Sequence, residues 1–587
     1  MHPRHPPPRP APPLLPHASL TGQLPALGWC RFEGGTTGLH APRRGQRRVP
    51  VARTGRRSGS PTSARRWDAT ASPNSANRGK QPRRRPLGNS LAVPSADQWT
   101  GGPHYEALRG APRCSAMVSR RRGTFPGMRT HDLVIVGAGS GNAIVDDRFS
   151  HLDVAIVDEG LFGGTCLNRG CIPSKMLVHV ADVADGVRDA GSLGVEATLR
   201  GVRWADVRAR VFGRLDQEAA EGEEGRRGSP NVHVYKGHAR FTEARTLLVG
   251  AGEGAVRIRG EQVVVAAGSR PTVPEPVAES GLPYETSDTI MRRDAPPRHL
   301  AVLGGGYVAA ELAHVFHAAG SRVTVIEQED TLLPAQDETV AAAYTEIAAD
   351  RYDVRTGTAL TRVEGAPGRL VLVLDDGTTV EADTLLVAVG RIPNGDRIQA
   401  DRAGIALRND GRIVVDAFQR TTATGVFALG DVCTPFPLKH VANREARVVA
   451  HNLLHADDLV RTVHEAVPAA VFTRPQIAQV GRTEGECRME GLDYTVAVRR
   501  FSDSAYGWAL EDGTGFCKVL ADRRTGLLLG AHIIGPQAAT LIQPLVVAMS
   551  LGIDATTLAR TPYWIHPAAT EAVSNALLDL DLDSRTP

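Results

Sequence analysis

Short apolar runs rich in β-branched residues stand directly before glycines and acids in the central part of the chain. Residues 133–136 lead into the glycine-rich segment 137–141, and residues 154–157 end at Asp158. Runs of four such residues, bounded by turn-forming residues, predict buried strands of a parallel sheet. This part of the chain therefore predicts a strand, a glycine turn, a helix N-terminus and a second strand that ends in an acid.

A second unit of the same design follows about 165 residues later. Residues 300–303 precede the three glycines 304–306, and residues 323–326 end at Glu327. In dinucleotide-binding βαβ units, glycines let the backbone approach a pyrophosphate at a helix N-terminus, and the acid binds a ribose hydroxyl. Two such units predict two dinucleotides, which is how a flavoprotein meets a nicotinamide.

The two units supply candidate nucleotide-binding residues, which are Gly137, Gly139, Gly141 and Asp158 in the first unit and Gly304, Gly306 and Glu327 in the second. Asn142 takes the third glycine position of the first fingerprint, which weakens the expectation of close helix–strand packing there. Glu327 favours an unphosphorylated ribose and hence NADH, because no arginine occurs between Arg322 and Arg351 to bind a 2′-phosphate. The alternative is a solvated Glu327 with an arginine arriving from elsewhere.

Two cysteines, Cys166 and Cys171, follow the first unit. In a regular helix their Cα atoms would lie about 8 Å apart, beyond disulfide reach, so the segment must bend. Gly170 and Pro173 supply the bend and predict that Cys171 lies at a helix N-terminus, where the dipole favours a thiolate. A zinc site is disfavoured because no second closely spaced cysteine pair exists. A purely structural disulfide is disfavoured in a chain that otherwise resembles cytosolic proteins.

Charge and composition set the first 127 residues apart. They hold 22 Lys and Arg against four Asp and Glu, and 19 of the 39 prolines. This composition predicts a disordered basic extension, with translation of the working enzyme beginning near Met128 or Met117. Binding of nucleic acid by the extension is the less favoured alternative. The extension lacks the apolar core of a secretory signal, and no later segment predicts a membrane span, so we expect a cytoplasmic protein.

The motifs taken in order resemble those of the pyridine nucleotide–disulfide reductase family, from residue 128 to the C-terminus. The ordered set comprises the first glycine unit, Cys166 and Cys171, residues 266–271, the second glycine unit, residues 390–394, Gly430 and Asp431, residues 472–475, and His566 with Glu571. The resemblance implies an α/β fold with two Rossmann-like domains, an α+β dimerisation domain and a disordered N-terminal extension. The implied segments are 1–127 (extension), 128–290 and 396–462 (FAD domain), 291–395 (NAD(P) domain) and 463–587 (dimerisation domain).

The resemblance also implies roles for individual residues. It adds Gly164, Thr165, Lys175, Gly268, Gly390, Arg391 and Asp431 to the cofactor-binding residues, with Asp431 on the flavin ribityl chain. Lys175 and Glu311 would pair beside the flavin and the nicotinamide. Cys171 would lie nearer the flavin and Cys166 would attack a small-molecule disulfide. His566, oriented by Glu571, would protonate the leaving thiolate in the active site of the other subunit of a homodimer.

The substrate follows only from similarity within the family. Six segments are most similar to the branch that reduces mycothione, the disulfide of mycothiol, namely 139–142, 211–216, 438–443, 505–509, 543–545 and 563–566. Enzymes of that branch are generally described as using NADPH, whereas Glu327 favours NADH. Dihydrolipoamide dehydrogenase is the nearest alternative, and a non-catalytic flavin-binding redox sensor is the second.

Overall fold

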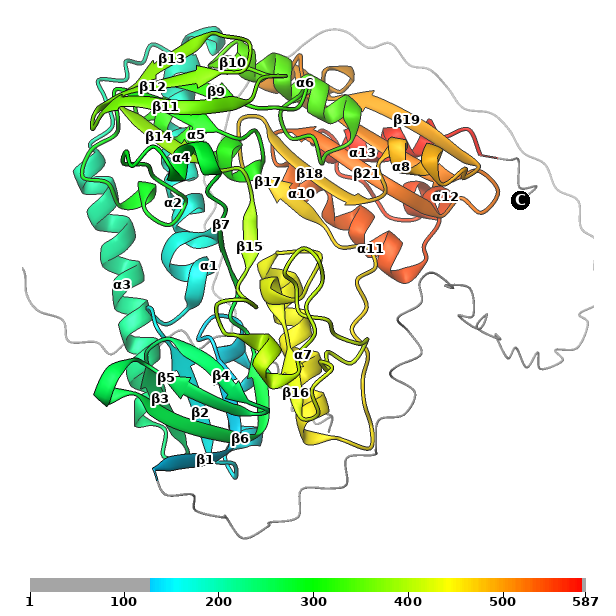
Figure 1. Cartoon of the computed structure of the whole chain (residues 1–587). Helices are drawn as coiled ribbons and strands as arrows, with labels where there is room; N and C mark the ends of the chain where they lie inside the picture. The colour runs from blue at the N-terminus through cyan, green and yellow to red at the C-terminus, as the bar shows by residue number, and fades with distance from the viewer. Residues whose placement is uncertain (1–126, 583–587) are drawn as a thin grey trace, which may run out of the picture. The chain divides into compact units, whose positions relative to one another are not determined.

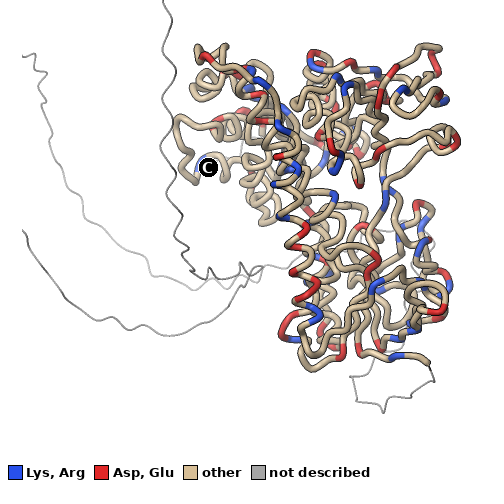
Figure 2. The backbone as a smooth tube through the Cα atoms, turned by 90° about the vertical axis from the view of Figure 1, so that its left-hand side faces the viewer, with Lys and Arg blue, Asp and Glu red and all other residues tan. Residues whose placement is uncertain are grey.

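The computed structural model describes residues 127–582. The predicted N-terminal extension and the candidate start Met117 lie outside this range. The described residues carry 45 Lys and Arg against 59 Asp and Glu, and Figure 2 shows the two signs interspersed along the chain. Over this range, none of the helices combines the length and hydrophobicity that a membrane span needs.

A seven-stranded sheet forms the first Rossmann-like part, in the order β3-β2-β1-β6-β5-β4 with β16 added against β6 (Figure 1). Its strands are β1 (Met128–Val136), β2 (Val154–Asp158), β3 (Val232–Lys236), β4 (Ala239–Glu243), β5 (Thr246–Val249), β6 (Val256–Val265) and β16 (Val426–Ala428). Strands β3, β2, β1, β6 and β16 run parallel, with Leu133 opposite Val154. Both predicted strands of the first glycine unit are therefore confirmed.

Four helices belong to this part of the chain, namely α1 (Gly164–Arg169), α2 (Cys171–Asp189), α3 (Trp204–Gly228) and α7 (Lys439–Leu454). Helix α3 contacts β3, and α2 packs against α5 (Tyr307–Ala318) of the second Rossmann-like part. The buried face of β1 and β2 packs against apolar residues of α7, including Ala446 and Val449. Helix α3 also reaches the second Rossmann-like part, where Trp204 contacts Phe316 with ring centroids 5.3 Å apart. Segments distant in sequence thus enclose one core.

The sequence predicts a helix N-terminus after the first glycine turn, but no regular α-helix follows that turn. Two short 3₁₀ turns, η2 (Gly141–Ile144) and η3 (Asp147–Phe149), stand in its place. Arg226 of α3 donates hydrogen bonds to the side chain and carbonyl of Asn142 and to the carbonyl of Val145, at 2.7–2.9 Å. Carbonyls that would accept bonds within a longer helix are bound by this guanidinium instead, so the helix stops after one turn.

The second Rossmann-like part has a four-stranded parallel sheet, β10-β9-β8-β14, and a three-stranded antiparallel sheet, β11-β12-β13. Its elements are β8 (His299–Leu303), α5 (Tyr307–Ala318), β9 (Arg322–Ile326), α6 (Glu338–Ala349), β10 (Asp353–Arg355), β11 (Leu360–Ala366), β12 (Arg369–Leu374), β13 (Thr379–Ala382) and β14 (Thr384–Val387). The strand pair β7 (Ser269–Pro271) and β15 (Arg391–Pro393) joins the two Rossmann-like parts, and α4 (Glu275–Ala278) follows β7 in the chain (Figure 1). The second glycine unit is confirmed as a strand, a turn and a regular helix.

The C-terminal part is a five-stranded antiparallel sheet, β17-β18-β21-β20-β19, covered by helices. Its strands are β17 (Ala469–Val471), β18 (Gln476–Gly481), β19 (Tyr494–Arg500), β20 (Phe516–Asp522) and β21 (Leu528–Gly535). Its helices are α8 (Glu484–Met489), α9 (Ala505–Leu510), α10 (Ala538–Leu541), α11 (Gln543–Leu551), α12 (Ala555–Arg560) and α13 (Thr570–Leu578). The remaining 3₁₀ turns of the structure are η4 (Ala190–Leu193), η5 (Gly252–Gly254), η6 (Ile290–Arg292), η7 (Ala400–Ala403), η8 (Gly430–Val432) and η9 (Phe501–Asp503).

A buried ion cluster ties this C-terminal part to α6. Lys518 on β20 is 1% exposed, and its Nζ lies 2.7 Å from Asp337 Oδ1 and from Glu484 Oε2. Asp337 also caps α6 by accepting the Thr339 N–H. Burial opposes ionisation of Asp337, but the Glu484 N–H and Lys518 hold the pKa of its carboxyl below the ordinary value. Its contribution to stability is therefore present above the ordinary carboxyl pKa and is lost as the pH falls through the lowered value.

We expect Lys518→Met to lower the free energy of unfolding by about 3–5 kcal/mol, because it leaves the Asp337 carboxylate buried without its cation. Lys236→Met is the matched control, since the Lys236–Glu223 pair is 3.1 Å long with side chains 37% and 22% exposed, and its loss should cost less than about 1 kcal/mol. Urea unfolding at pH 7 followed by circular dichroism measures both. Equal unfolding midpoints for the two variants would contradict a special role for the buried pair.

Candidate active site

A cavity of about 880 Å³ opens between the two Rossmann-like parts and the N-terminus of α7. Twelve of the predicted site residues line it, namely Gly137, Gly139, Asp158, Gly164, Thr165, Cys166, Cys171, Lys175, Gly268, Glu311, Arg391 and Asp431. Gly141 is buried behind the first glycine turn, where an added Cβ would lie 2.8 Å from the Ala266 side chain. The fold therefore brings most of the predicted residues to one place.

Bare backbone forms one wall of the cavity. Gly164 has a φ of +61°, and a Cβ on it would lie 2.7 Å from the Cα of Gly139. Side chains are therefore excluded where the first glycine turn meets α1. Asp158 closes this wall, because its carboxylate accepts the N–H groups of Ala138 at 2.6 Å and Gly160 at 2.7 Å.

The opposite wall is a hydrogen-bonded network. Asp431 accepts the Ser269 hydroxyl at 2.8 Å. Arg391 donates from Nε to the same hydroxyl and from Nη2 to the Ser269 carbonyl, both at 2.8 Å. Behind it, the fully buried Glu445 accepts the Gly430 N–H at 2.7 Å and so holds the turn that carries Asp431. The sequence motifs did not point to Glu445, which is an ordinary helix residue by its pattern.

The second glycine turn surrounds a buried carboxylate. Glu327 is 8% exposed, and it accepts the N–H groups of Gly305 and, at 3.0 Å, of Glu329. The alternative of a solvated strand-end carboxylate is therefore wrong. Arg355 on the neighbouring strand β10 pairs instead with Asp353, at 2.9 Å. Gly306 precedes α5 as its N-cap residue.

Lys175 and Glu311 join α2 to α5 across the cavity. The Lys175 Nζ lies 2.7 Å from Oε1 and 2.6 Å from Oε2 of Glu311. Glu311 is only 4% exposed and also accepts the Phe472 N–H at 3.0 Å. The predicted pairing of these two side chains is thus present in the fold, 136 residues apart in sequence.

The cysteine segment bends as the sequence predicts. Helix α1 ends at Arg169, Gly170 has φ −141° and ψ −120°, and α2 begins at Cys171. The bend places the two thiols within hydrogen-bonding distance. The hydrogen bond from Cys166 and the Lys175 cation lower the pKa of the Cys171 thiol to about 7, against the effect of burial. The same hydrogen bond, together with burial, raises the pKa of the Cys166 thiol.

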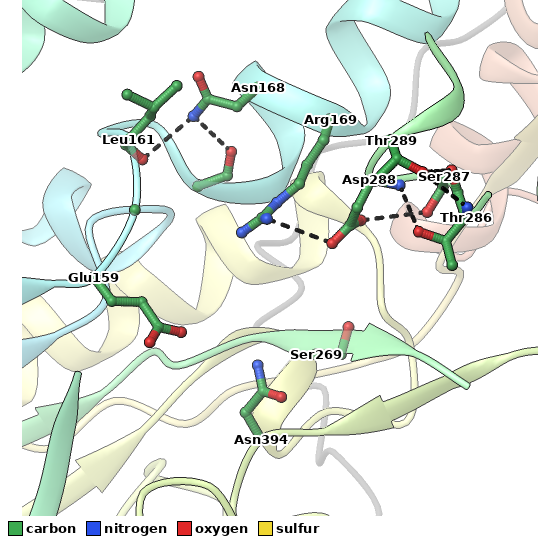
Figure 3. A network of polar contacts seen from close by, with 12 residues as sticks. Glu159, Leu161, Asn168, Arg169, Ser269, Thr286, Ser287, Asp288, Thr289 and Asn394 are labelled. Carbon is green, nitrogen blue, oxygen red and sulfur yellow. Dashed lines mark hydrogen bonds and ion pairs between the residues drawn. The ribbon is translucent and has the colours of Figure 1, made fainter. Parts of the chain in front are cut away.

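Two residues between the cysteines were not among the predicted site residues (Figure 3). Arg169 reaches towards Asp288, with Nη1 and Oδ2 3.5 Å apart. Asn168 donates from Nδ2 to the carbonyls of Phe162 at 2.8 Å and Gly164 at 3.0 Å. Asn168 therefore holds the loop in front of α1, and its position between the cysteines was the only signal in the sequence.

His566 and Glu571 lie outside this cavity. The Nδ1 of His566 is 2.7 Å from Oε1 of Glu571, and the His566 side chain is 72% exposed. The hydrogen bond to His566 holds the pKa of the Glu571 carboxyl below its ordinary value. Tyr563 and Ile565 are exposed beside the histidine. Within one chain, the pair is preassembled and is not part of the cavity that holds the cysteines.

The sequence matches two family profiles. Residues 131–467 match the pyridine nucleotide-disulphide oxidoreductase family, and residues 467–577 match the dimerisation domain of that family. The chain belongs to this family. Its membership confirms the predicted fold class and an enzyme rather than a non-catalytic sensor: a flavoprotein disulfide oxidoreductase that uses FAD and NAD(P)H.

Individual relatives cover almost all of the described residues. Mycothione reductase of Mycobacterium tuberculosis is 50% identical over 462 residues, which is 77% of this chain and 100% of the relative. Dihydrolipoyl dehydrogenase of Haloferax volcanii is 34% identical over 463 residues, or 76% of this chain and 95% of the relative. The solved Cu(II) complex of RclA, a HOCl-induced flavoprotein disulfide reductase of Escherichia coli, has a TM-score of 0.69 at 26% identity and covers 77% of this chain and 99% of its own.

Proposed function

We propose that this enzyme reduces mycothione to two molecules of mycothiol, with electrons from reduced nicotinamide. The observation that carries this proposal is the 50% identity to mycothione reductase over the whole length of that relative, against 34% for a dihydrolipoyl dehydrogenase. The residues that carry out disulfide exchange do not identify the molecule that carries the thiol. The chemistry of the cavity therefore supports the reaction type, and the similarity supports the substrate.

The cavity fits a dinucleotide cofactor. Its bare glycine wall leaves room for a diphosphate, and the carboxylates of Asp158 and Asp431, which line it, would accept hydrogen bonds from ribose and ribityl hydroxyls. Bound FAD supplies hydride acceptance from nicotinamide and electron transfer to a disulfide. We assign its contacts to Gly137, Gly139, Gly141, Asp158, Gly164, Thr165, Lys175, Gly268 and Asp431, and those of the nicotinamide coenzyme to Gly304, Gly306, Glu327, Gly390 and Arg391.

The two cysteines have different roles in the thiol–disulfide exchange. Once the Cys166–Cys171 disulfide is reduced, the Cys166 thiolate attacks one sulfur of mycothione, forming a mixed disulfide and releasing the first mycothiol thiolate. The Cys171 thiolate attacks Cys166, releases the second mycothiol and restores the disulfide. The lowered pKa of Cys171, about 7, supports its role as the resting thiolate on the flavin side. Lys175, paired with Glu311, supplies a cation next to it.

His566 is the proposed acid for the departing thiolate, with Glu571 orienting it. The short pair, the exposed imidazole and the neighbouring exposed Tyr563 and Ile565 support its use in the cavity of a second subunit. The match to a dimerisation domain supports a homodimer. We further propose the domain limits 128–290 with 396–462, 291–395 and 463–587, which the separate seven-stranded, four-stranded and five-stranded sheets support. We also propose that the enzyme works in the cytoplasm, where thiols stay reduced.

The coenzyme is proposed to be NADH. Glu327 keeps a buried negative charge in the second glycine turn, and that charge disfavours a 2′-phosphate while accepting ribose hydroxyls. Arg355, the cation on the adjacent strand, is occupied by Asp353. Both observations favour an unphosphorylated ribose.

Steady-state oxidation of NADH and NADPH, with mycothione, lipoamide and glutathione disulfide as acceptors, tests both proposals. We expect turnover with mycothione and a kcat/KM for NADH at least about tenfold above that for NADPH. Turnover of lipoamide alone would place the enzyme with the dihydrolipoyl dehydrogenases. A preference for NADPH would contradict the role of Glu327 and leave the substrate proposal intact.

A further inference from the structure

Two histidines and an aspartate gather at the end of the first sheet that lies away from the cavity. Strands β1, β2 and β3 are neighbours in that sheet (Figure 1). His131 lies in β1, Asp153 immediately precedes β2, and His233 is the second residue of β3. The cavity is lined by the opposite ends of these strands, at Val136 and Val157. At about 3.3 Å per residue, His131 and Val136 are about 17 Å apart along β1, so the cluster is separate from the proposed active site.

The three side chains bring their ligand atoms together. Oδ1 of Asp153 lies 2.8 Å from Nδ1 of His131 and 3.3 Å from Nε2 of His233. The imidazole rings of the two histidines have centroids 5.2 Å apart. One ligand atom from each of the three side chains lies within 4.8 Å of the other two. Donor atoms from three adjacent strands are therefore close enough to bind a single ion.

The donor set and its spacing suit Zn²⁺. Two imidazoles and a carboxylate are ligands that this ion accepts in proteins. Zn²⁺ binds nitrogen and oxygen at about 2.0–2.2 Å, so two ligands of a tetrahedral site lie about 3.3–3.6 Å apart. The contact between His233 and Asp153 already has this length, and the contact between His131 and Asp153 has to lengthen by about 0.5 Å. The His233 side chain is 51% exposed, which leaves it room to turn and admits a water as the fourth ligand.

The surroundings of His131 fit a metal ligand. His131 is 5% exposed, and its Nε2 lies 2.9 Å from the Tyr235 hydroxyl. A histidine that binds a metal through one ring nitrogen almost always donates a hydrogen bond from the other, which fixes the tautomer and the orientation of the ring. Tyr235 is two residues after His233 on β3, so the two side chains share a face of the sheet. The Tyr235 hydroxyl therefore holds the His131 ring with Nδ1 towards Asp153.

We propose that His131, Asp153 and His233 form a Zn²⁺ site that clips the beginnings of β1, β2 and β3 together. In the ion-free chain, a proton between His131 Nδ1 and Asp153 Oδ1 holds the same geometry. In the loaded site Zn²⁺ occupies that position, and the ring proton of His131 lies on Nε2, from which it is donated to the Tyr235 hydroxyl. A purely structural hydrogen bond has the same short contacts but retains no Zn²⁺, so metal binding distinguishes the two.

The first test is equilibrium dialysis against Zn²⁺ of the full-length, FAD-loaded, oxidised enzyme after treatment with a chelator. Oxidation keeps Cys166 and Cys171 in a disulfide, so their thiolates do not bind the ion. Tyr235→Phe keeps all three ligands and should lower the Zn²⁺ affinity about 10- to 100-fold, as expected for loss of a ligand's hydrogen-bond partner. His233→Ala removes a ligand and should cost at least about 100-fold. His179→Ala, at an exposed histidine of α2, is the matched control and should leave the affinity unchanged.

The second test locates the ion by modification of histidines with diethyl pyrocarbonate, quantified for each peptide by mass spectrometry. Zn²⁺ on Nε2 of His233 blocks a nitrogen that the reagent attacks. At a Zn²⁺ concentration about ten times the Kd, His233 should therefore react about tenfold more slowly than in the ion-free enzyme. His179 should react at the same rate with and without Zn²⁺.

Four results would overturn the inference: no Zn²⁺ retained by the wild-type chain, an unchanged affinity in His233→Ala, an equal loss in His179→Ala, or tight binding without protection of His233, which would place the ion elsewhere in the chain. The proposed function is tested separately. Turnover of mycothione should be the same in His233→Ala and in the wild-type enzyme, because the site lies at the far end of the strands from the cavity. Failure of either proposal therefore leaves the other standing.

Discussion

Cys166→Ser should reduce the turnover of mycothione by at least about 1,000-fold while leaving reduction of the bound flavin by nicotinamide unchanged. The physical reason is that a serine hydroxyl stays protonated at neutral pH and cannot form the mixed disulfide, whereas a thiolate can. Flavin reduction needs the nicotinamide and the cavity around it but not the attacking sulfur. The two half-reactions are separated by anaerobic stopped-flow absorbance with NADH alone and by steady-state assay with mycothione.

The same variant reports on Cys171. Because serine can replace Cys166 as a hydrogen-bond donor, the Cys171 thiol should keep a pKa near 7. The thiolate beside the oxidised flavin should then give a long-wavelength charge-transfer band that appears as the pH rises through this value. Cys171→Ser should lack the band. Cys487→Ser is the control, because Cys487 is buried in the C-terminal part with a pKa raised by burial and should leave turnover unchanged. Full turnover in Cys166→Ser would contradict the assignment of Cys166 as the attacking thiol.

His566→Ala should lower kcat by about 100- to 10,000-fold, the range that a positioned general acid contributes. The loss should be confined to the disulfide half-reaction, because the proposed role of the imidazole is to protonate the departing thiolate and not to take part in flavin reduction. Glu571→Gln should have a smaller effect of the same kind, since it removes the group that orients the ring. His455→Ala, at an exposed histidine directly after α7, serves as the control.

Mixing two variants tests whether His566 acts in the active site of the other subunit. If each active site takes Cys166 from one subunit and His566 from the other, a heterodimer of Cys166→Ser and His566→Ala has one complete site of two. Refolding the two inactive variants together in equal amounts should recover about one quarter of wild-type activity, because about half of the dimers are mixed. A mixture that stays inactive would contradict the shared site.

The pKa of Glu571 sets the lowest pH at which the His566–Glu571 contact persists. Its hydrogen bond to His566 lowers the pKa of the carboxyl, so the carboxylate persists below the pH at which an ordinary glutamate is protonated. The orienting contact is therefore present from neutral pH down through the usual carboxyl range and is lost only as the pH falls through the lowered value. The short contact between His566 Nδ1 and Glu571 Oε1 is the interaction that lowers the pKa of the Glu571 carboxyl.

The amino-acid sequence by itself determined the features that depend on neighbouring residues. A β-branched run, a glycine turn and a terminal acid lie within about 25 positions of one another, so their pattern predicted both dinucleotide units and the strands that build them. The bend between Cys166 and Cys171 is equally local, because Gly170 and Pro173 set it. The order of the motifs was enough to indicate the family and the residues that line the cavity.

The tertiary structure decided everything that depends on contacts between distant segments. Arg226, 84 residues from Asn142, ends the first helix after one 3₁₀ turn. Burial of Glu327 depends on the backbone of two loops, and the hydrogen bond from Lys439 to Ser140 joins residues 299 positions apart. Desolvation and charge balance are set by distances in the folded chain, which no local pattern of residues contains. For the same reason, the sequence identifies Glu571 as the partner of His566 but does not show in which active site the pair works.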